Sequence, residues 1–343
     1  MKKVGILTFH DGINYGAFLQ VYCLYHTIRD MGFMVEVINY KNITHWLKEW
    51  AYFLLTTKSI ANMRKIAKFR RSQGILQQSD FAFKIQKIIA KKAYDFIVVG
   101  SDEVWNVNNC MFGFDPVYFG VNCSSRWISY APSFGSTNLD DNTLARIKSA
   151  INRFDNISVR DENSARIVEL LTDHLPHIVP DPTLLRETPE LEIDPEIEYQ
   201  YCLVYSAKHF SINERNEIIA FAQQNDKKLV SVGAERDWCF ASISDAGVGE
   251  WLGLYKHADF IFTTMFHGTL FSIKYNKPFC LFLDPYRRNK FYPILSLLSL
   301  EGRLYNKGCL KDILSCDIDY ETVSNRLYSF KLKGISILKN FLS

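Results

Sequence analysis

Short apolar runs and amphipathic stretches alternate along the first forty residues of the chain. Residues 4–9 form an apolar run that predicts a buried strand, and residues 34–40 predict a second one. Between them, apolar residues recur at helical spacing over 16–31, and Gly32 marks the end of that helix. A strand, a helix and a strand in this order predict a βαβ unit with parallel strands and a right-handed crossover.

The same alternation continues along the chain in two blocks. The first block continues with predicted strands at 94–100, 127–131, 156–159 and 177–179 and a helix at 162–172. A stretch over 186–200 then breaks the pattern, because it is rich in acidic residues and contains two prolines, as is typical of an interdomain linker. The second block has predicted strands at 201–207, 228–233, 259–264 and 278–283, and helices at 213–225, 249–257, 268–276 and 289–300.

These blocks predict an α/β protein of two Rossmann-like, doubly wound domains that face each other across a substrate cleft. A chain of 343 residues is too long for one ordinary domain. We expect an N-terminal domain over 1–185, a linker over 186–200 and a C-terminal domain over 201–318. Residues 319–343 predict a C-terminal helix, and packing back on the N-terminal domain is one placement for it.

One segment, 41–92, does not follow the alternation. It carries twelve Lys or Arg residues against two acids, so its net charge is +10 and that of the remaining chain is −7. Aromatic and basic residues cluster within 42–72, which leaves two interpretations open. This helical insertion of the N-terminal domain either rests on an anionic membrane surface, or packs its aromatic side chains on the core and exposes a solvated basic face.

The composition argues against several classes of function. Net charge is only +3, which disfavours a nucleic-acid-binding protein. The eight cysteines include no CxxC pair, so neither a zinc site nor a disulfide framework is expected. The N-terminal apolar run is too short for a signal peptide and no later segment reaches transmembrane length, so we expect a cytoplasmic protein.

The most informative stretch is 259–279, DFIFTTMFHGTLFSIKYNKPF. Its apolar start, 260–262, predicts a buried strand, and a helical pattern begins near His267. The imidazole of His267 is therefore expected at the carboxyl end of a strand, beside the backbone N–H groups of a helix start. Open α/β sheets bind ligands at that edge, and helix N-termini attract phosphate and carboxylate, so His267 is a candidate functional residue.

Two further turns follow predicted strands of the first block. In the first, HDGINYG at 10–16, glycines permit close backbone approach and amides could hold an anion or a sugar hydroxyl, although a plain βα turn explains it too. It lacks the GxGxxG fingerprint, so a dinucleotide is disfavoured. In the second, GSDEVWN at 100–106, Asp102 would either position or deprotonate a hydroxyl, or cap the next helix or turn.

Arg160 and Asp181 follow the last two predicted strands of the first block. Arg160, within ISVRD, suits bidentate recognition of phosphate or carboxylate. The adjacent Asp161 could instead pair with Arg160 or cap the following helix. Asp181 lies between two prolines in PDPT, where a turn residue with a local hydrogen bond is the simpler interpretation.

Taken together, NYGAFLQ, GSDEVWN, ISVRDENSA, PDPTLL and TTMFHGTLFSIKYNKPF resemble the polysaccharide pyruvyl transferase family, in its order and roughly its spacing, over about residues 4–285. The resemblance implies a GT-B-like fold and transfer of a pyruvyl group from phosphoenolpyruvate to two sugar hydroxyls as a cyclic ketal. It also implies a role in capsule, exopolysaccharide or cell-wall polymer synthesis, in some cases on a lipid-linked acceptor. No metal or organic cofactor is implied.

The resemblance also implies roles for individual residues. His267 would protonate the methylene carbon of phosphoenolpyruvate, and Arg160 would hold its phosphate or carboxylate. Asp102 or Asp181 would position or deprotonate the sugar hydroxyls. Further substrate contacts are expected from Asn14, Gly16, Ser101, Phe266, Gly268, Thr269, Arg288 and Lys208.

One position departs from the family pattern. Related sequences often carry an arginine two residues before the histidine, where this chain has Met265. Arg288, Lys274 or Lys208 could supply the missing cation. Two other functions remain open, a glycosyltransferase that uses a nucleotide sugar on the same scaffold and a non-catalytic sugar-binding protein.

Overall fold

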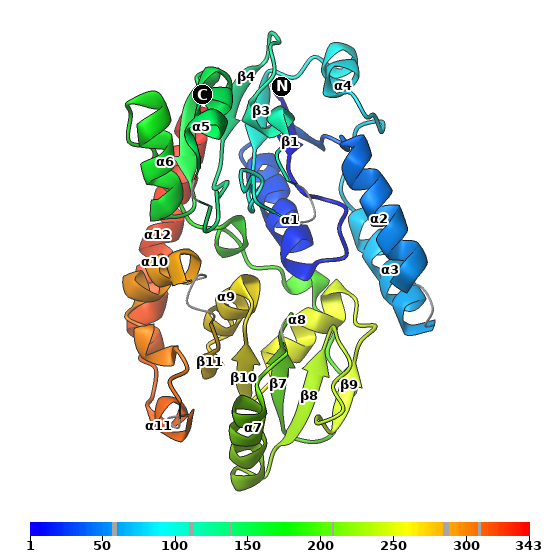
Figure 1. The fold of residues 1–343 in the computed structure, drawn as a ribbon, viewed down its shortest axis with the longest axis vertical. Helices are drawn as coiled ribbons and strands as arrows, with labels where there is room; N and C mark the ends of the chain where they lie inside the picture. The colour runs from blue at the N-terminus through cyan, green and yellow to red at the C-terminus, as the bar shows by residue number, and fades with distance from the viewer. Residues whose placement is uncertain (57–59, 110–112, 138, 208, 284–287, 308–309) are drawn as a thin grey trace. The chain divides into compact units, whose positions relative to one another are not determined.

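The computed structural model describes residues 1–56, 60–109, 113–137, 139–207, 209–283, 288–307 and 310–343, with only the backbone at 49, 50, 52–56, 141, 288 and 289 (Figure 1). The chain forms two compact units. Unit 1 contains Met1–Lys58, Gln73–Glu187 and Tyr328–Ser343, and unit 2 contains Ser59–Ser72 and Thr188–Leu327.

Unit 1 contains a six-stranded, fully parallel sheet in the order β2-β1-β3-β4-β5-β6, of which β1, β3 and β4 are labelled in Figure 1. The strands are β1 (Lys3–Leu7), β2 (Met34–Val37), β3 (Phe96–Val99), β4 (Arg126–Ser129), β5 (Phe154–Val159) and β6 (His177–Ile178). The helices and 3₁₀ turns of this unit are α1 (Tyr15–Asp30), α2 (Ile43–Thr56), α4 (Ile85–Lys92), η1 (Pro116–Phe119), α5 (Asp141–Ile151), α6 (Glu162–Thr172) and η2 (Pro182–Leu184).

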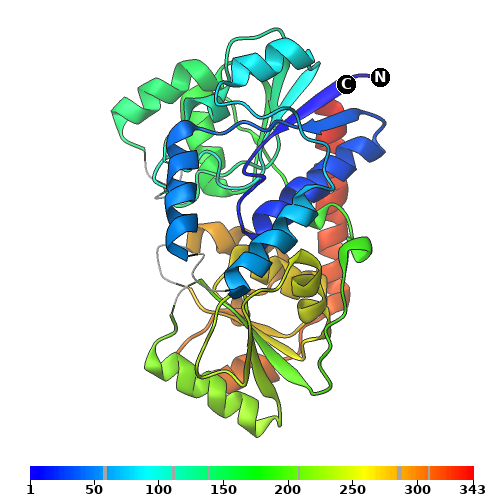
Figure 2. The same ribbon diagram turned by 90° about the vertical axis from the view of Figure 1, so that its right-hand side faces the viewer.

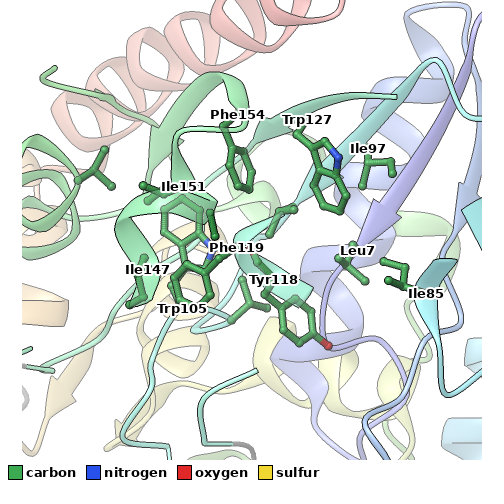
Figure 3. Packing of buried hydrophobic residues seen from close by; sticks show 14 of the residues in the cluster. Leu7, Ile85, Ile97, Trp105, Tyr118, Phe119, Trp127, Ile147, Ile151 and Phe154 are labelled. Carbon is green, nitrogen blue, oxygen red and sulfur yellow. Dashed lines mark hydrogen bonds between the residues drawn. The ribbon is translucent and has the colours of Figure 1, made fainter. Parts of the chain in front are cut away.

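A large aromatic cluster fills one side of this sheet (Figure 3). Trp105 is fully buried there, lies parallel to Phe119 with a ring separation of 5.8 Å, and donates a hydrogen bond from Nε1 to the carbonyl of Tyr118 at 2.8 Å. Phe154 of β5 lies edge-on to Trp105, also at 5.8 Å. Because a buried Trp needs a partner for its N–H, this bond fixes the segment that follows β3 against the core.

The C-terminal helix α12 (Tyr320–Phe341) ends on unit 1. A Cβ at Gly334 would lie 2.7 Å from both the Pro180 ring and the Tyr130 hydroxyl oxygen, so the helix passes these residues at close range. The two chain ends lie side by side (Figure 2), where Lys2 Nζ donates to the backbone oxygen of Ser343 at 2.8 Å.

Unit 2 contains a five-stranded parallel sheet in the order β11-β10-β7-β8-β9. Its strands are β7 (Tyr201–Tyr205), β8 (Lys228–Val232), β9 (Ala241–Ile243), β10 (Phe260–Thr263) and β11 (Phe279–Leu281). Its helices and 3₁₀ turns are α3 (Ile60–Gln73), η3 (Pro189–Leu191), α7 (Ile212–Gln224), α8 (Val248–His257), α9 (Phe266–Lys274), α10 (Arg288–Leu298), η5 (Glu301–Arg303) and α11 (Leu310–Ser315). A capping box of Ser211 and Glu214 starts α7.

The predicted fold class is confirmed, since each unit is an α/β, doubly wound, Rossmann-like domain with an all-parallel sheet. The division into units differs from the predicted domain bounds in two places. Ser59–Ser72 of the basic insertion belongs to unit 2, because Lys65 donates to the carbonyl of Gly233 and Lys68 to Glu250. Most of the predicted linker also belongs to unit 2, because it packs on α8.

Candidate functional site

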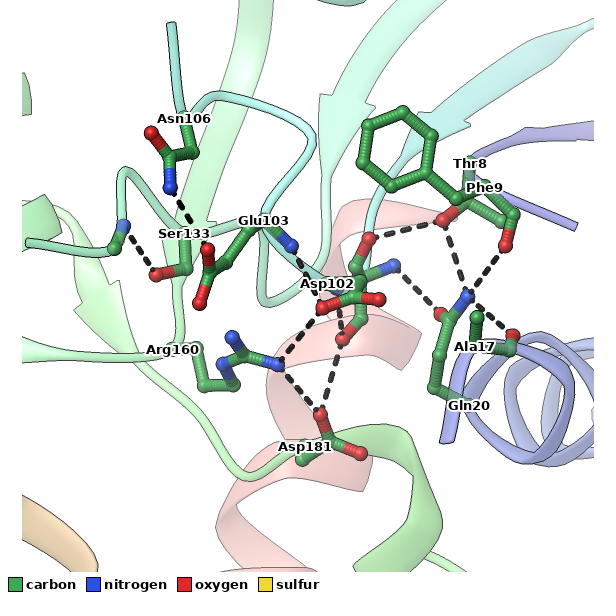
Figure 4. A network of polar contacts seen from close by, with 12 residues as sticks. Thr8, Phe9, Ala17, Gln20, Asp102, Glu103, Asn106, Ser133, Arg160 and Asp181 are labelled. Atoms are coloured by element: carbon green, nitrogen blue, oxygen red, sulfur yellow. Dashed lines mark hydrogen bonds and ion pairs between the residues drawn. The ribbon is translucent and has the colours of Figure 1, made fainter. Parts of the chain in front are cut away.

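In the first sheet the chain adds β2 on one side of β1 and the later strands, from β3 onward, on the other side. The position between β1 and β3 is therefore the topological switch point of this parallel sheet, called its reversal point below. A network of polar side chains lies there (Figure 4). Thr8, directly after β1, donates from Oγ1 to the carbonyl of Ser101 at 2.9 Å. Gln20 of α1 donates to Thr8 Oγ1 at 3.1 Å and accepts from the Ser101 N–H at 3.2 Å. Ligands bind α/β sheets at such reversal points, so this network marks the candidate site of unit 1.

Arg160 and Asp181 form a buried ion pair in the same network (Figure 4). Arg160 Nη1 lies 3.0 Å from Asp181 Oδ2 and 3.8 Å from Asp102 Oδ1. Ser101 Oγ donates to the same Asp181 oxygen at 3.3 Å, and Thr183 donates to the other one through both its N–H and its hydroxyl. Both oxygens of Asp181 are therefore engaged in holding Arg160 and the PDPT turn.

Carboxylates surround Arg160 and set its electrostatics. Burial by itself would lower the pKa of Arg160, but the charges of Asp181, Asp102, Glu103 and Asp161 outweigh it, so the pKa is raised. The guanidinium therefore stays charged in its buried position. Asp161 also caps α6, since its Oδ1 accepts from the Ser164 N–H at 2.8 Å, as one interpretation of the sequence expected.

Asp102 is the more accessible of the two carboxylates that pair with Arg160. Its side chain is 16% exposed, against 1% for Asp181 and 4% for Arg160. Its backbone adopts a left-handed conformation with φ of +70°, which is uncommon for a residue with a side chain. Its Oδ1 accepts from the N–H of the adjacent Glu103 at 2.9 Å, a contact within the turn, and part of the side chain still reaches solvent.

The turn after β1 leads directly into α1, and its residues cap that helix. Asn14 is the N-cap of α1, and its side-chain oxygen accepts from the Ala17 N–H at 3.2 Å. Gly16 is buried within the first turn of the same helix. These contacts correspond to the plain βα turn that the sequence allowed, and the substrate contacts expected of both residues stay predictions.

The second sheet reverses direction between β7 and β10, and short hydroxyl side chains connect the two strand ends. Ser206 follows β7 and Thr264 follows β10, and their hydroxyl oxygens lie 2.9 Å apart. Thr263 Oγ1 donates to the carbonyl of Tyr205 at 2.8 Å and accepts from the Met265 N–H at 3.1 Å. The turn from β10 into α9 is therefore fixed by side-chain hydrogen bonds at the reversal point of unit 2.

His267 lies in the first turn of α9, at this reversal point, and is 9% exposed. Phe266 lies edge-on to it with ring centroids 5.4 Å apart, and Thr269 Oγ1 donates to the carbonyl of Met265 at 3.1 Å. A Cβ at Gly268 would lie 2.3 Å from Thr263 Oγ1, so close packing requires a glycine there. The structure thus places the motif around His267 where the strand pattern predicted it, on a strand-to-helix turn.

Three cations are candidates to replace the family arginine at Met265. Lys208 and the side chain of Arg288 lie outside the described residues. Lys274, in the last turn of α9, stacks over the ring of Phe271 at 5.4 Å.

Sequence reasoning missed Arg236, which follows β8 and is 9% exposed. Its Nη2 donates to the carbonyl of Ser206 at 2.7 Å, beside the reversal point, and burial lowers its pKa. Arg236 could have been identified from the sequence because it lies three residues after the predicted strand 228–233.

Comparison with known proteins decides the family. The model of the family "Polysaccharide pyruvyl transferase" matches residues 14–284, which include Arg160, Asp181 and His267. The chain belongs to the polysaccharide pyruvyl transferase family. A search of curated protein sequences finds no match.

Solved structures similar to this pyruvyl transferase family member show its fold. They include a UDP co-structure of MnaA from S. aureus (12% identity, 96% of this chain and 91% of that one, TM-score 0.50). They also include the glycotransferase of kitacinnamycin (8%, 99% and 98%, TM-score 0.54) and UGT89C1 of Arabidopsis thaliana complexed with quercetin (11%, 98% and 98%, TM-score 0.52). At these identities the likeness establishes the GT-B fold alone.

Across the described ranges, no three His, Cys, Asp or Glu side chains group as ligands of a metal ion would. Among the helices described, none combines the length and the apolar character needed to cross a bilayer.

Proposed function

We propose that the protein transfers the pyruvyl group of phosphoenolpyruvate to two hydroxyls of a saccharide as a cyclic ketal. Membership of the polysaccharide pyruvyl transferase family supports this assignment. The structural observation that carries it is His267, which lies in the first turn of α9 at the reversal point of the second sheet. An imidazole beside helix N–H groups is suited to an anionic substrate that has to be protonated.

The reaction needs one proton donor, one leaving phosphate and two attacking hydroxyls. Protonation of the methylene carbon gives a methyl group and an oxocarbenium-like centre at the adjacent carbon. The first hydroxyl adds there and loses its proton, the bond from that carbon to the phosphate oxygen breaks, and inorganic phosphate leaves. The second hydroxyl then closes the ketal and releases its own proton. Of the two hydroxyl protons, one replaces the proton that the general acid gave to the methylene carbon, and the other leaves with the phosphate.

Each role has a candidate side chain. His267 acts as the general acid that protonates the methylene carbon. Arg160 stabilises the charge on phosphate or carboxylate, because the surrounding carboxylates keep it protonated. Asp102, the more accessible carboxylate, receives a hydroxyl proton, while Asp181 holds Arg160 in place. Asn14, Ser101, Phe266 and Thr269 remain proposed substrate contacts, and the chemistry requires no cofactor.

The setting of the reaction follows from its product class. We place it in the cytoplasm, in the synthesis of a capsular polysaccharide, an exopolysaccharide or a cell-wall polymer. A lipid-linked acceptor would bring the protein to the inner face of the membrane, where the basic segment 42–72 would make the contact.

Thermal unfolding with candidate donors tests the proposal. Phosphoenolpyruvate at a hundredfold excess over Kd should stabilise the protein by about 2.7 kcal/mol, since a ligand bound only to the folded state contributes RT ln(1 + [L]/Kd). The shift should weaken in Arg160→Ala and be absent with inorganic phosphate, UDP-sugars and GDP-sugars. Stabilisation by a nucleotide sugar alone would contradict the proposal and favour a glycosyltransferase.

A further inference from the structure

A small cavity of about 200 Å³ lies wholly within unit 2, at the carboxyl end of β7 and β8. The start of α7 forms one side of it and the loop after β8 forms the other. Sites for drug-sized ligands usually measure about 300–1,000 Å³, so this volume suits a single ring. Its lining combines aromatic, cationic and acidic side chains.

Two aromatic side chains form the apolar part of the lining. Trp238 is half-buried and lies edge-on to Phe210, with ring centroids 5.8 Å apart. Phe210 is in turn buried against Phe282 at 5.1 Å. Trp238 is therefore held by a packed ring and offers a preorganised apolar wall.

The polar part of the lining offers donors and acceptors together. Arg215 and Arg236 supply planar guanidinium groups, and the exposed carboxylates of Glu235 and Asp237 supply acceptors. The Nε of Arg215 is buried, and among the described residues it makes no hydrogen bond. A buried N–H of this kind is stabilised when a ligand oxygen accepts from it.

We propose that this cavity is a binding subsite for one sugar ring. Two arginines against two carboxylates leave the lining close to neutral, which disfavours a dianion such as phosphate. A hydroxyl both donates and accepts, and a lining with guanidinium and carboxylate groups satisfies both. The apolar C–H face of a pyranose matches the surface of Trp238, and the volume admits one such ring.

The subsite is connected to the reversal point through Arg236. That side chain lines the cavity and also donates to the carbonyl of Ser206, whose hydroxyl lies 2.9 Å from that of Thr264. As an acceptor subsite the cavity rests on the proposed function, since the ring it holds would belong to the saccharide to be pyruvylated. It selects the acceptor through shape and hydroxyl pattern.

Nuclear magnetic resonance of ¹⁵N-labelled indoles tests the subsite without any turnover. The chain has six Trp residues, and the indole signal of Trp238 is the one missing from Trp238→Phe. Titration with methyl glycosides of hexoses, 2-acetamidohexoses and uronic acids, without phosphoenolpyruvate, should shift this signal. Arg215→Ala should weaken binding at least tenfold. Phe240→Ala, an exposed aromatic side chain two residues from Trp238 that does not line the cavity, should not.

The outcomes separate the subsite from the reaction. Glycoside binding at Trp238 without phosphoenolpyruvate turnover would support the subsite and overturn the proposed reaction. Turnover with an acceptor KM unchanged in Arg215→Ala and Trp238→Ala would leave the reaction and overturn the subsite. A panel in which no glycoside moves the Trp238 signal, or in which UMP or UDP binds there in preference, would overturn it as well.

Discussion

Three charged or titratable side chains, two in unit 1 and one in unit 2, differ in how each could take part in the chemistry. Asp181 is buried and has both oxygens engaged, which is typical of a residue that positions another. Asp102 is partly exposed and lies 3.8 Å from Arg160, so it is better suited to meet a substrate. His267 lies at the reversal point of its own sheet, apart in sequence from both.

The His267→Ala variant should lose activity through the proton transfer step. Loss of a general acid costs roughly 10²–10⁴-fold in rate, and we expect kcat for pyruvyl transfer to fall within that range. Steady-state release of inorganic phosphate measures it. His174→Ala, an exposed histidine in the loop after α6, is the matched control and should retain normal turnover. Wild-type turnover of His267→Ala would remove His267 from the mechanism.

Substitution of Asp181 should lower mainly the free energy of unfolding, and substitution of Asp102 should lower mainly turnover. Asp181→Asn leaves the buried Arg160 without its closest ion-pair partner, and breaking such a pair costs about 3–5 kcal/mol in the free energy of unfolding. Asp102→Asn should cost about 1 kcal/mol or less, because its side chain is partly exposed and an Asn side-chain oxygen can still accept from the Glu103 N–H. Turnover should fall in Asp102→Asn although this variant stays much more stable than Asp181→Asn. Urea unfolding and phosphate release of both variants check the pair, and the reverse pattern would exchange the two roles.

At the scale of elements, the acidic segment 188–200 packs against α8, and it is called the strap below. Ile193 donates its N–H to the carbonyl of Gly249 at 3.1 Å, and Glu192 pairs with Lys256 at 2.7 Å. A Cβ at Gly253 would lie 1.9 Å from the carbonyl oxygen of Ile193. The glycines of α8 therefore let the strap approach the helix backbone.

Gly253→Ala should detach the strap from α8. A contact of 1.9 Å with backbone cannot be relieved by rotating a side chain, so we expect a loss of about 1–3 kcal/mol in the free energy of unfolding, as for other overpacked sites. Gly302→Ala is the matched control, because a Cβ there meets nothing within 4 Å. Denaturant unfolding of both variants measures the difference. Equal stabilities would show that the strap does not pack tightly on α8.

The elements that the sequence predicted well are those with a strong local pattern. The apolar runs of β1, β3, β7 and β10 and the turn that carries His267 were expected where they occur. The short edge strand β9 has no such run, since it alternates half-buried and exposed residues. The pairing of Arg160 with Asp181, twenty-one residues apart, depends on neighbouring strand ends and not on spacing, so it could not be deduced from local pattern.

At the scale of the whole molecule, the basic segment 41–92 gives the sequence its uneven charge, and several of its cations lie on α3. Lys65 and Lys68 contact Gly233 and Glu250 of unit 2, so two cations of the basic segment serve packing. The other side of the helix exposes Ile60, Met63, Arg64 and Arg71, at spacings that share one helix face. A face of this kind combines apolar and cationic side chains, as interfacial helices do.

We therefore expect the protein to bind vesicles that contain anionic lipid, and to bind less as salt is raised. Each Arg near such a surface contributes about 1 kcal/mol, so reversing two in Arg64→Glu/Arg71→Glu should weaken binding by at least roughly thirtyfold. Lys333→Glu/Lys339→Glu, which reverses two exposed cations on α12, controls for net charge. Vesicle sedimentation measures all three proteins. If the wild-type protein binds anionic and neutral vesicles equally, the basic face is solvated and the membrane is not a partner. If both double variants lose binding equally, the effect is one of net charge and α3 is not the contact.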